Sequence, residues 1–395
     1  MAECGAAGDS TPEQENKPMK KPVYLDYNGT TPHDPEVIDA MRPFLDEEFG
    51  NPSSTHWFGI APKRAVIHAR KQVASLLNCD PEEIIFTSGG TEANNHAILG
   101  TAFENRHKGN HVITSQIEHP AVLEVCRFLE ENGFRVKYLP VDEFGMVSVS
   151  DVEAAITPET ILITIMHANN EVGTIEPIEE IAGLARRHGI VLHTDAAQSM
   201  GKISTDVKAL GVDLLSVAGH KLYAPKGIGA LYRRKGIKLR KFMLGAGQEV
   251  GQRAGTENVL EIVGLGKACE IAMRDLGKNA DNMRHTRDLL HNGLKTRLKH
   301  VRLNGHHDKR LPNTLNLSFL GLEANRMLEE IGLDVAASAG AACHSDHVQI
   351  SHVLEAMGVP IEWAKGTLRF TTGRMTTEEE ITRAIEVITD AVTRL

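Results

Sequence analysis

Short apolar runs alternate with amphipathic stretches through the first two thirds of the chain. Runs of this kind are typical of strands buried on both faces of a sheet. They predict strands at residues 84–86, 111–114, 161–165, 190–193 and 214–217. Before and between them, apolar residues recur at helical spacing and predict helices at residues 35–49, 61–77, 92–99, 121–131 and 178–187. The alternation predicts an α/β fold with a mainly parallel sheet covered on both faces.

The pattern changes after about residue 265. Long helices are predicted at residues 267–299, 323–331 and 378–395, with one strand at 314–319. The last helix has a clear start, because Thr377 and Glu380 have the spacing of a capping box. We therefore expect a large domain at residues 35–265 and a smaller α+β domain built from residues 22–34 and 266–395. Residues 1–21 are polar, and we expect them to form a disordered tail.

The composition narrows the class of protein. The chain has 395 residues and a formal net charge of −9, so nucleic acid is not expected as a partner. Its five cysteines are odd in number and form no C-x-x-C pair, which indicates a reducing compartment rather than a disulfide framework. No apolar run has the length of a membrane helix, and the first 21 residues lack arginine. We therefore expect a cytoplasmic protein with no membrane partner.

Candidate chemistry follows the predicted strands, because ligands of open α/β sheets collect at the carboxyl ends of the strands. Gly90 and Thr91 stand at the start of a helix, whose free N–H groups favour an anion. His119, Asp195 and Lys221 each follow another strand. Each of these features has an ordinary structural alternative: a strand-to-helix turn, a structural histidine, a helix N-cap and a surface lysine.

The combination is more specific than its parts. A desolvated lysine, a carboxylate at a strand end and a helix start that binds phosphate are the groups that suit pyridoxal 5'-phosphate. In this interpretation Lys221 forms an imine with the cofactor, and Asp195 keeps the ring nitrogen protonated. The helix that starts near Gly90 holds the phosphate.

Ordered motifs run along nearly the whole chain from Val23 onward. They lie at residues 24–32, 50–54, 88–95, 118–120, 168–171, 193–198, 219–227, 247–249, 253–258 and 310–314. In these motifs the chain resembles the fold-type I pyridoxal-phosphate enzymes of the class V aminotransferase group. Within that group it is similar to the NifS- and IscS-like cysteine desulfurases and to the related selenocysteine lyases.

The resemblance implies a role for each matching residue around the cofactor. Lys221 would be the Schiff-base lysine, and His119 would stack on the pyridine ring. Asp195 would pair with the ring nitrogen, and Gln198 would contact the ring hydroxyl. The residues expected to bind the phosphate are Gly90, Thr91 and His220.

The resemblance also implies a shared site and a carboxylate clamp. Thr256 would reach the phosphate of the other subunit, so the protein would be a homodimer. Asn169, beside the cofactor, and Arg369 would hold the substrate carboxylate, a group that a guanidinium binds through both oxygens.

Cys343 determines the reaction that the resemblance implies. It lies among small residues at 336–346, a setting that suits an accessible thiolate. In such enzymes this cysteine attacks the sulfur of L-cysteine, which releases L-alanine and leaves a persulfide for an accepting protein. The acceptor stays open among an iron–sulfur scaffold, a selenium pathway and a thiolation protein.

Two departures keep an alternative open. The desulfurases often have a serine three residues before the lysine, where this chain has Ala218, so one phosphate contact is lost. Residues 343–347 are closer to the loop of selenocysteine lyases. The expected function is a cysteine desulfurase, and the alternative is a lyase that releases selenium from L-selenocysteine.

The sequence also has two less favoured interpretations. Cys343, His344, His347 and His352 have the side chains of a zinc site, but the loop already accounts for them and no metal is expected. A catalytically silent scaffold of the same fold is disfavoured, because a scaffold has no need of the whole set of site residues.

Overall fold

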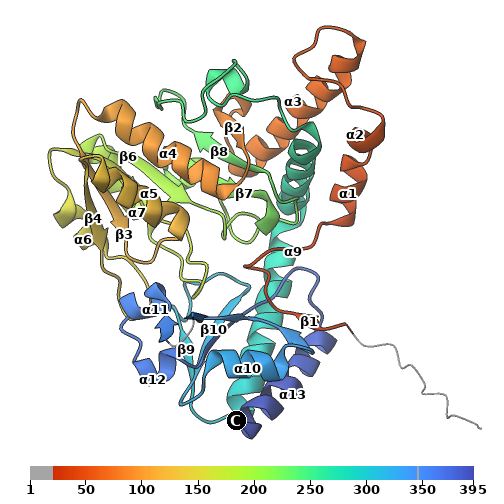
Figure 1. Ribbon diagram of the computed structural model, residues 1–395, viewed down its shortest axis with the longest axis vertical. Helices are drawn as coiled ribbons and strands as arrows, with labels where there is room; N and C mark the ends of the chain where they lie inside the picture. Colours follow the sequence, from red (N-terminus) through yellow and green to blue (C-terminus); the bar gives the residue numbers. More distant parts are fainter. Residues whose placement is uncertain (1–20, 345–346) are drawn as a thin grey trace, which may run out of the picture.

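The computed structural model describes residues 21–344 and 347–395, the side chains of residues 341–349 excepted. Its larger part is built on a seven-stranded sheet (Figure 1). The strands, in their order across the sheet, are β2 (Ile84–Thr87), β8 (Gly229–Arg233), β7 (Leu214–Ala218), β6 (Val191–Asp195), β5 (Thr160–Thr164), β3 (His111–Ser115) and β4 (Arg135–Leu139). Only β8 runs antiparallel to its neighbours, so the expected mainly parallel sheet is confirmed.

Helices cover both faces of this sheet. Buried residues of α4 (Gly90–Asn105) and α5 (Pro120–Glu131) form the cores on one face. The core on the other face is contributed by α3 (Trp57–Leu77), α6 (Val149–Ala155), α7 (Ile178–His188), α8 (Val207–Leu210) and the first half of α9 (Val259–Arg297). Burial on both faces explains why the parallel strands read as continuous apolar runs.

The smaller part has its own sheet and core. Strand order is β12 (Ser338–Ala339), β15 (Thr367–Thr371), β10 (Thr314–Phe319) and β9 (Val301–Asn304), all antiparallel. Beside it β1 (Val23–Tyr24) pairs in parallel with β11 (Val335–Ala336). Helices α10 (Ala324–Ile331), α13 (Glu378–Arg394) and the end of α9 complete the core. The N-terminal segment thus packs with the C-terminal third of the chain, as Figure 1 shows.

Three short features lie between the two parts. Strands β13 (Ala341–His344) and β14 (His347–Ile350) form a hairpin in which Cys343 pairs with Val348. It leads into α11 (His352–Ala356) and α12 (Ile361–Ala364). In the described part of the chain, no helix is long and apolar enough to cross a membrane.

Several elements differ from the expectation. The helix expected at residues 35–49 is two helices, α1 (Pro35–Met41) and α2 (Pro43–Asp46), because Pro43 cannot donate to the preceding turn. Helix α9 begins at Val259 and runs through the boundary expected at residue 265. Its early residues pack in the larger core and Leu290 and Leu294 in the smaller. The two-domain division therefore stays a prediction, with no linker at that point. The capping box of Thr377 and Glu380 is confirmed.

Candidate active site

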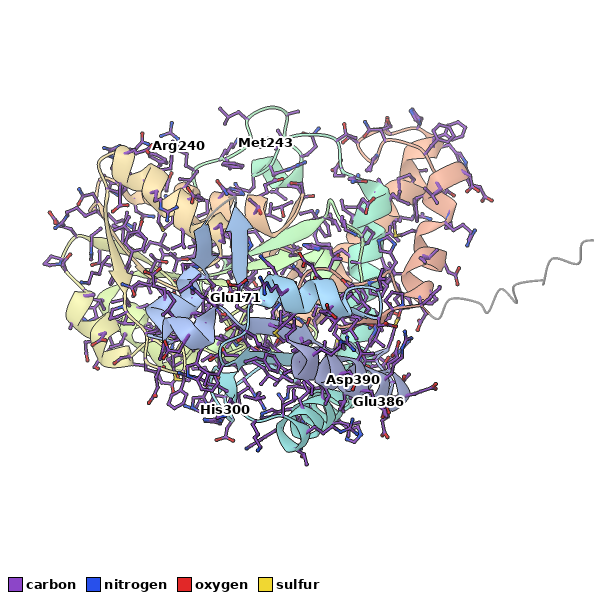
Figure 2. The ribbon with its side chains drawn as sticks, turned by 60° about the horizontal axis from the view of Figure 1, so that its bottom comes forward. Glu171, Arg240, Met243, His300, Glu386 and Asp390 are labelled. Atoms are coloured by element: carbon purple, nitrogen blue, oxygen red, sulfur yellow. The ribbon has the colours of Figure 1, made fainter. Side chains whose placement is uncertain are left out.

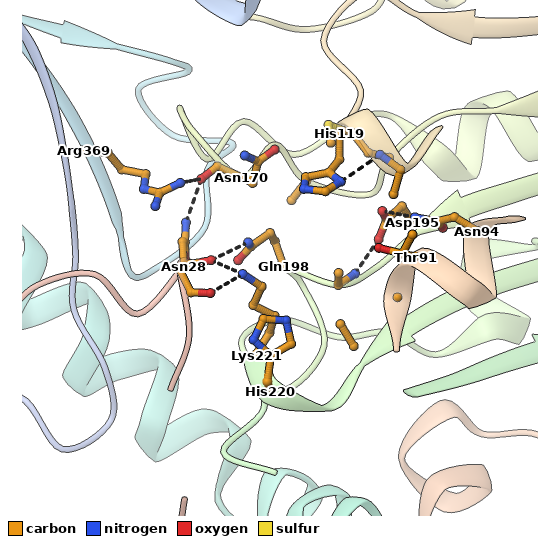
Figure 3. Close-up of a pocket in the computed structure, with 17 residues that line it drawn as sticks. Asn28, Thr91, Asn94, His119, Asn170, Asp195, Gln198, His220, Lys221 and Arg369 are labelled. Atoms are coloured by element: carbon orange, nitrogen blue, oxygen red, sulfur yellow. Dashed lines mark hydrogen bonds between the residues drawn. The ribbon is translucent and has the colours of Figure 1, made fainter. Parts of the chain in front are cut away.

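A cavity of about 300 Å³ opens where the expected site residues meet (Figure 3). It lies at the carboxyl ends of β6 and β7 and at the starts of α4 and α5. Its volume is at the lower end of the range for cofactor and small-molecule sites. The expected residues on its wall are Gly90, Thr91, His119, Asp195, Gln198, His220, Lys221 and Arg369.

The start of α4 provides a cradle for an anion. Gly89 precedes it with a φ of 153°, a conformation that favours glycine. A Cβ on Gly90 would lie 3.1 Å from Cβ of Ala218, so this position has room for little besides hydrogen. The first N–H groups of a helix have no partner within it and point outward. Thr91 and His220 also line the cavity, and burial lowers the pKa of His220 to about 4, so its imidazole is neutral.

Asp195, the last residue of β6, is held by two donors. Its Oδ2 accepts a hydrogen bond from Nδ2 of Asn94 at 2.7 Å, and its Oδ1 accepts one from the N–H of Ala197 at 2.9 Å. Asn94 lies one turn into α4, so the helix that forms the anion cradle also orients this carboxylate. A carboxylate fixed in this way can hold a proton on a ring nitrogen.

His119 stands at the N-cap of α5. Its Nδ1 accepts a hydrogen bond from the N–H of Ala121 at 3.1 Å, which leaves the proton of a neutral ring on Nε2. Burial lowers the pKa of His119. The ring is therefore a neutral, oriented wall of the cavity.

Lys221 ends a short 3-10 helix, Gly219–Lys221, directly after β7. Its Nζ donates to the backbone oxygen of Asn28 and, at 2.6 Å, to that of Gly29. Burial and the charge of Arg369 lower the pKa of Lys221 to about 8. A lysine poised in this way is a nucleophile near neutral pH.

Arg369, on β15, reaches the opposite end of the cavity (Figure 3). Its Nη2 lies 2.8 Å from Oδ1 of Asp26, and its Nη1 donates to the backbone oxygen of Asn170 at 3.0 Å. The guanidinium is thus held by Asp26 from the smaller part of the molecule and by Asn170 from the larger part, and it faces the cavity between these residues. This arrangement suits recognition of a carboxylate.

The structure does not place Asn169 on the wall of the cavity, so its expected role stays a prediction. Its side chain is fully buried, and its Oδ1 accepts hydrogen bonds from the N–H groups of Glu171 and Val172. Its Nδ2 donates to the backbone oxygen of Ile117. The side chain therefore closes the turn after β5, and the next residue, Asn170, lines the cavity instead.

Asn28 is a further cavity residue, besides Asn94 and Asn170, that the sequence did not predict. Its backbone oxygen accepts from Lys221 and, at 3.1 Å, from Nε2 of Gln198. Its Nδ2 donates to the backbone oxygen of Asn170 at 3.1 Å and to Oγ1 of Thr314 at 2.9 Å. Its position in the turn after β1 gave no signal, because the contacts join segments that are distant in sequence.

Besides Asn169, two more expected residues are not placed in this cavity. Thr256 is exposed and does not line the cavity of its own chain. The thiol of Cys343 lies outside the described side chains, as do three of the four side chains of the suggested zinc site. Among the described residues, no cluster of three His, Cys, Asp or Glu is suited to a metal ion.

A family model decides the relationship of the chain. The model described as aminotransferase class-V matches residues 23–384. The chain belongs to the class-V aminotransferase family. This family uses pyridoxal 5'-phosphate, and the cavity fits that group: an anion cradle at α4, a fixed carboxylate and a nucleophilic lysine surround one space.

Individual class-V relatives cover nearly the whole chain. It is 49% identical over 378 residues to a Dictyoglomus turgidum protein named cysteine desulfurase IscS, covering 95% of this chain and 96% of that protein. It is 48% identical over 376 residues to a Methanosarcina thermophila protein of the same name, covering 95% and 93%. A solved NifS-like protein matches with a TM-score of 0.89 and 37% identity, covering 95% of this chain and all of that one. The structure of SspA in complex with cysteine matches at 0.79 and 38%, covering 90% and 100%.

Proposed function

We propose that this class-V protein is a cysteine desulfurase that releases L-alanine from L-cysteine and transfers the sulfur through Cys343. The observation that supports it most is the pairing, in one cavity, of Lys221 with a fixed Asp195 at one end and Arg369 at the other. Relatives named cysteine desulfurase, at 48–49% identity over nearly the whole chain, support the same reaction.

Each of several cavity residues has its own role in the proposed reaction. Pyridoxal 5'-phosphate, when bound, would supply an electron sink for negative charge that develops at the substrate's carbons. Lys221 is placed to take and return protons at that carbon, since its pKa of about 8 is close to neutrality. Asp195 would keep the proton on the ring nitrogen of the bound cofactor, and the neutral His119 would stack on the ring. Arg369 and Asn170 orient the substrate carboxylate.

Cys343 completes the transfer. Its thiolate attacks the substrate sulfur, the carbon–sulfur bond breaks, and a sulfur–sulfur bond forms on the enzyme. The electron pair of the broken bond stays with the carbon fragment, which is protonated to alanine. The persulfide then passes to an accepting protein. The other described cysteines are poor competitors, because burial raises the pKa of Cys79 and of Cys126 to about 12.

We also propose a homodimer with shared sites. The loop between β8 and α9 carries exposed apolar side chains, among them Leu244 and Val250, which are 79% and 83% exposed. Its Met243 lies at the edge of the molecule in Figure 2. Val250 also has a φ of 54°, a strained conformation for a β-branched residue. A second copy covering this loop would bury these side chains and bring Thr256 to the partner's phosphate cradle.

A selenocysteine lyase is the second candidate, favoured by the sequence of residues 343–347 and by Ala218. The test is alanine formation from L-cysteine and L-selenocysteine side by side, with the wild type and Cys343→Ala. A desulfurase turns over both, and the variant loses the cysteine rate. Turnover of selenocysteine alone would assign the protein to the lyases. Turnover of neither by protein with bound cofactor would reject both candidates.

A further inference from the structure

Lys202 is a buried lysine that has no part in the proposed mechanism, and it contacts two residues that line the cavity. It lies in the turn between β6 and α8 and is only 5% exposed. Lysine is rarely buried unless its ammonium is paired with a carboxylate. Here the partners are two amide oxygens instead. Nζ lies 3.0 Å from Oε1 of Gln198 and 3.1 Å from Oδ1 of Asn28.

These contacts fix the orientation of both amides. The lysine N–H groups donate, so each amide must present its oxygen to Lys202 and its NH2 group to the other side. For Gln198 that other side is the cavity, where Nε2 donates to the backbone oxygen of Asn28 at 3.1 Å. For Asn28 it is the backbone oxygen of Asn170 and Oγ1 of Thr314. Without Lys202 the oxygen of Gln198 loses its donor and the amide is free to turn over, whereas Asn28 keeps its other contacts.

The same network reaches Lys221. The backbone oxygen of Asn28 that accepts from Gln198 also accepts from Nζ of Lys221. Asn313 donates to Oδ1 of Asn28 at 2.9 Å from the smaller part of the molecule. Both Lys202 and Asn313 therefore donate to the side-chain oxygen of Asn28 and hold it in place. Burial and the charges of Lys221 and Arg369 lower the pKa of Lys202, and either form of its amine keeps N–H groups that can donate to both amides.

We propose that Lys202 is a positioning residue that orients Gln198, so that its N–H faces the ring hydroxyl of the cofactor, and holds Asn28 against Lys221. The proposal rests on the proposed function, because it concerns the same cofactor. It assigns Lys202 no contact with cofactor or substrate.

The test is Lys202→Met, which removes the donors at similar volume. Two quantities are measured: the dissociation constant of pyridoxal 5'-phosphate from the apoprotein, and the pH midpoint of the visible absorbance of the holoprotein. We expect affinity to fall by about tenfold, the loss of roughly one hydrogen bond. We expect the midpoint to rise, because Gln198 no longer holds its N–H toward the ring oxygen of the cofactor.

Other groups near Lys221 also act on that midpoint. They come from several elements: Asp26, His119, Asp195, His220 and Arg369. None of them is changed in the variant, so a shift reports Lys202. The matched control is Lys267→Met on α9, where Nζ donates to Glu270 at 2.7 Å away from the cavity. This control is expected to leave both quantities unchanged.

A double variant distinguishes a positioning role of Lys202 from a general contribution to the stability of the fold. In Gln198→Ala, further replacement of Lys202 by Met is expected to cost less than twofold in affinity, because the amide it orients is gone. An unchanged affinity and midpoint in Lys202→Met would overturn the proposal, and so would full additivity with Gln198→Ala. If Lys202→Met does not fold, Lys202→Gln, which is one atom shorter, is expected to raise the midpoint by a smaller amount. An unshifted midpoint in Lys202→Gln would overturn the proposal as well.

Failure of the wild type to bind the cofactor would instead reject the proposed function.

Discussion

At the scale of single residues, the binding properties of the site depend on charged side chains that are partly buried. Arg369 and Lys221 face the same cavity, and the charge of Arg369 helps to lower the pKa of Lys221. Asp26 holds Arg369 from behind, so the guanidinium is fixed before a substrate arrives. Such preorganisation lowers the cost of binding a carboxylate.

Arg369→Ala is expected to raise the KM for L-cysteine at least tenfold with a smaller change in kcat, because a charge-assisted pair with the substrate is lost. Steady-state kinetics measure this split. Arg374→Ala is the matched control, since Arg374 also pairs with an aspartate, Asp34, but does not line the cavity. Equal KM values for wild type and Arg369→Ala would contradict the carboxylate role.

Glu118, fully buried behind His119, makes stability depend on pH. Burial raises its pKa to about 8, while one oxygen accepts from Met166 and Ser115. The folded protein therefore keeps a proton that the unfolded chain, with an ordinary pKa of 4.5, has released. Stability from this group is complete below pH 4.5 and is lost as pH rises to 8, by up to about 1.4 kcal/mol per unit.

Glu118→Gln keeps an oxygen for both donors and removes the titration. The melting temperature of the cofactor-free variant is expected to fall less between pH 5 and about 8 than that of the wild type. Parallel melting curves for the two proteins across this range would show that Glu118 does not titrate there.

At the scale of elements, the junction of β7 with α4 determines how the phosphate is held. Ala218 ends β7 and packs against Gly90 at the start of α4. A serine in place of Ala218 would bring a hydroxyl beside the anion cradle.

Ala218→Ser is expected to tighten binding of pyridoxal 5'-phosphate by about three- to tenfold, the worth of one added hydrogen bond. Titration of the apoprotein with the cofactor measures it. Ala230→Ser, the same change in the buried core of β8, is expected to lower stability and leave the affinity unaltered. An unaltered or weaker affinity in Ala218→Ser would mean that this position does not face the phosphate.

A comparison of predicted and observed elements shows which parts of the structure the sequence alone predicts. The apolar runs predicted the central strands because burial on both faces leaves a clear signal. Strands β4, β8, β9 and β15 were missed: β4 is exposed on alternate residues, and the antiparallel course of β8 is set by its neighbours. Lys221, Asp195 and His119 followed from the rule on strand ends. Asn170 did not, because the hydrogen bonds of the turn decide which of two adjacent asparagines faces inward.

At the scale of the whole molecule, the cavity belongs to both parts. Asn28 and Arg369 come from the smaller part, and Lys221 and Asp195 from the larger. Helix α9 packs in both cores and joins them. The proposed homodimer adds a third contributor, Thr256 of the other copy.

Mixed dimers test that contribution. Lys221→Ala subunits cannot bond the cofactor, and Thr256→Ala subunits are expected to bind it about tenfold more weakly as homodimers. In a dimer of one of each, the intact Lys221 faces the intact Thr256, so normal affinity is expected at one site. Cofactor titration of purified mixed dimers measures this. Weak binding at that site would mean that Thr256 acts within its own chain.

The central claim is that sulfur leaves cysteine through Cys343. Its most direct test is mass spectrometry of the holoprotein after reaction with L-cysteine, with alanine measured in parallel. We predict one added sulfur atom on Cys343 in the wild type and in Cys79→Ala. Cys343→Ala is predicted to keep its visible absorbance and gain no sulfur. Undiminished alanine formation by Cys343→Ala, or sulfur found on another cysteine of the wild type, would contradict this account.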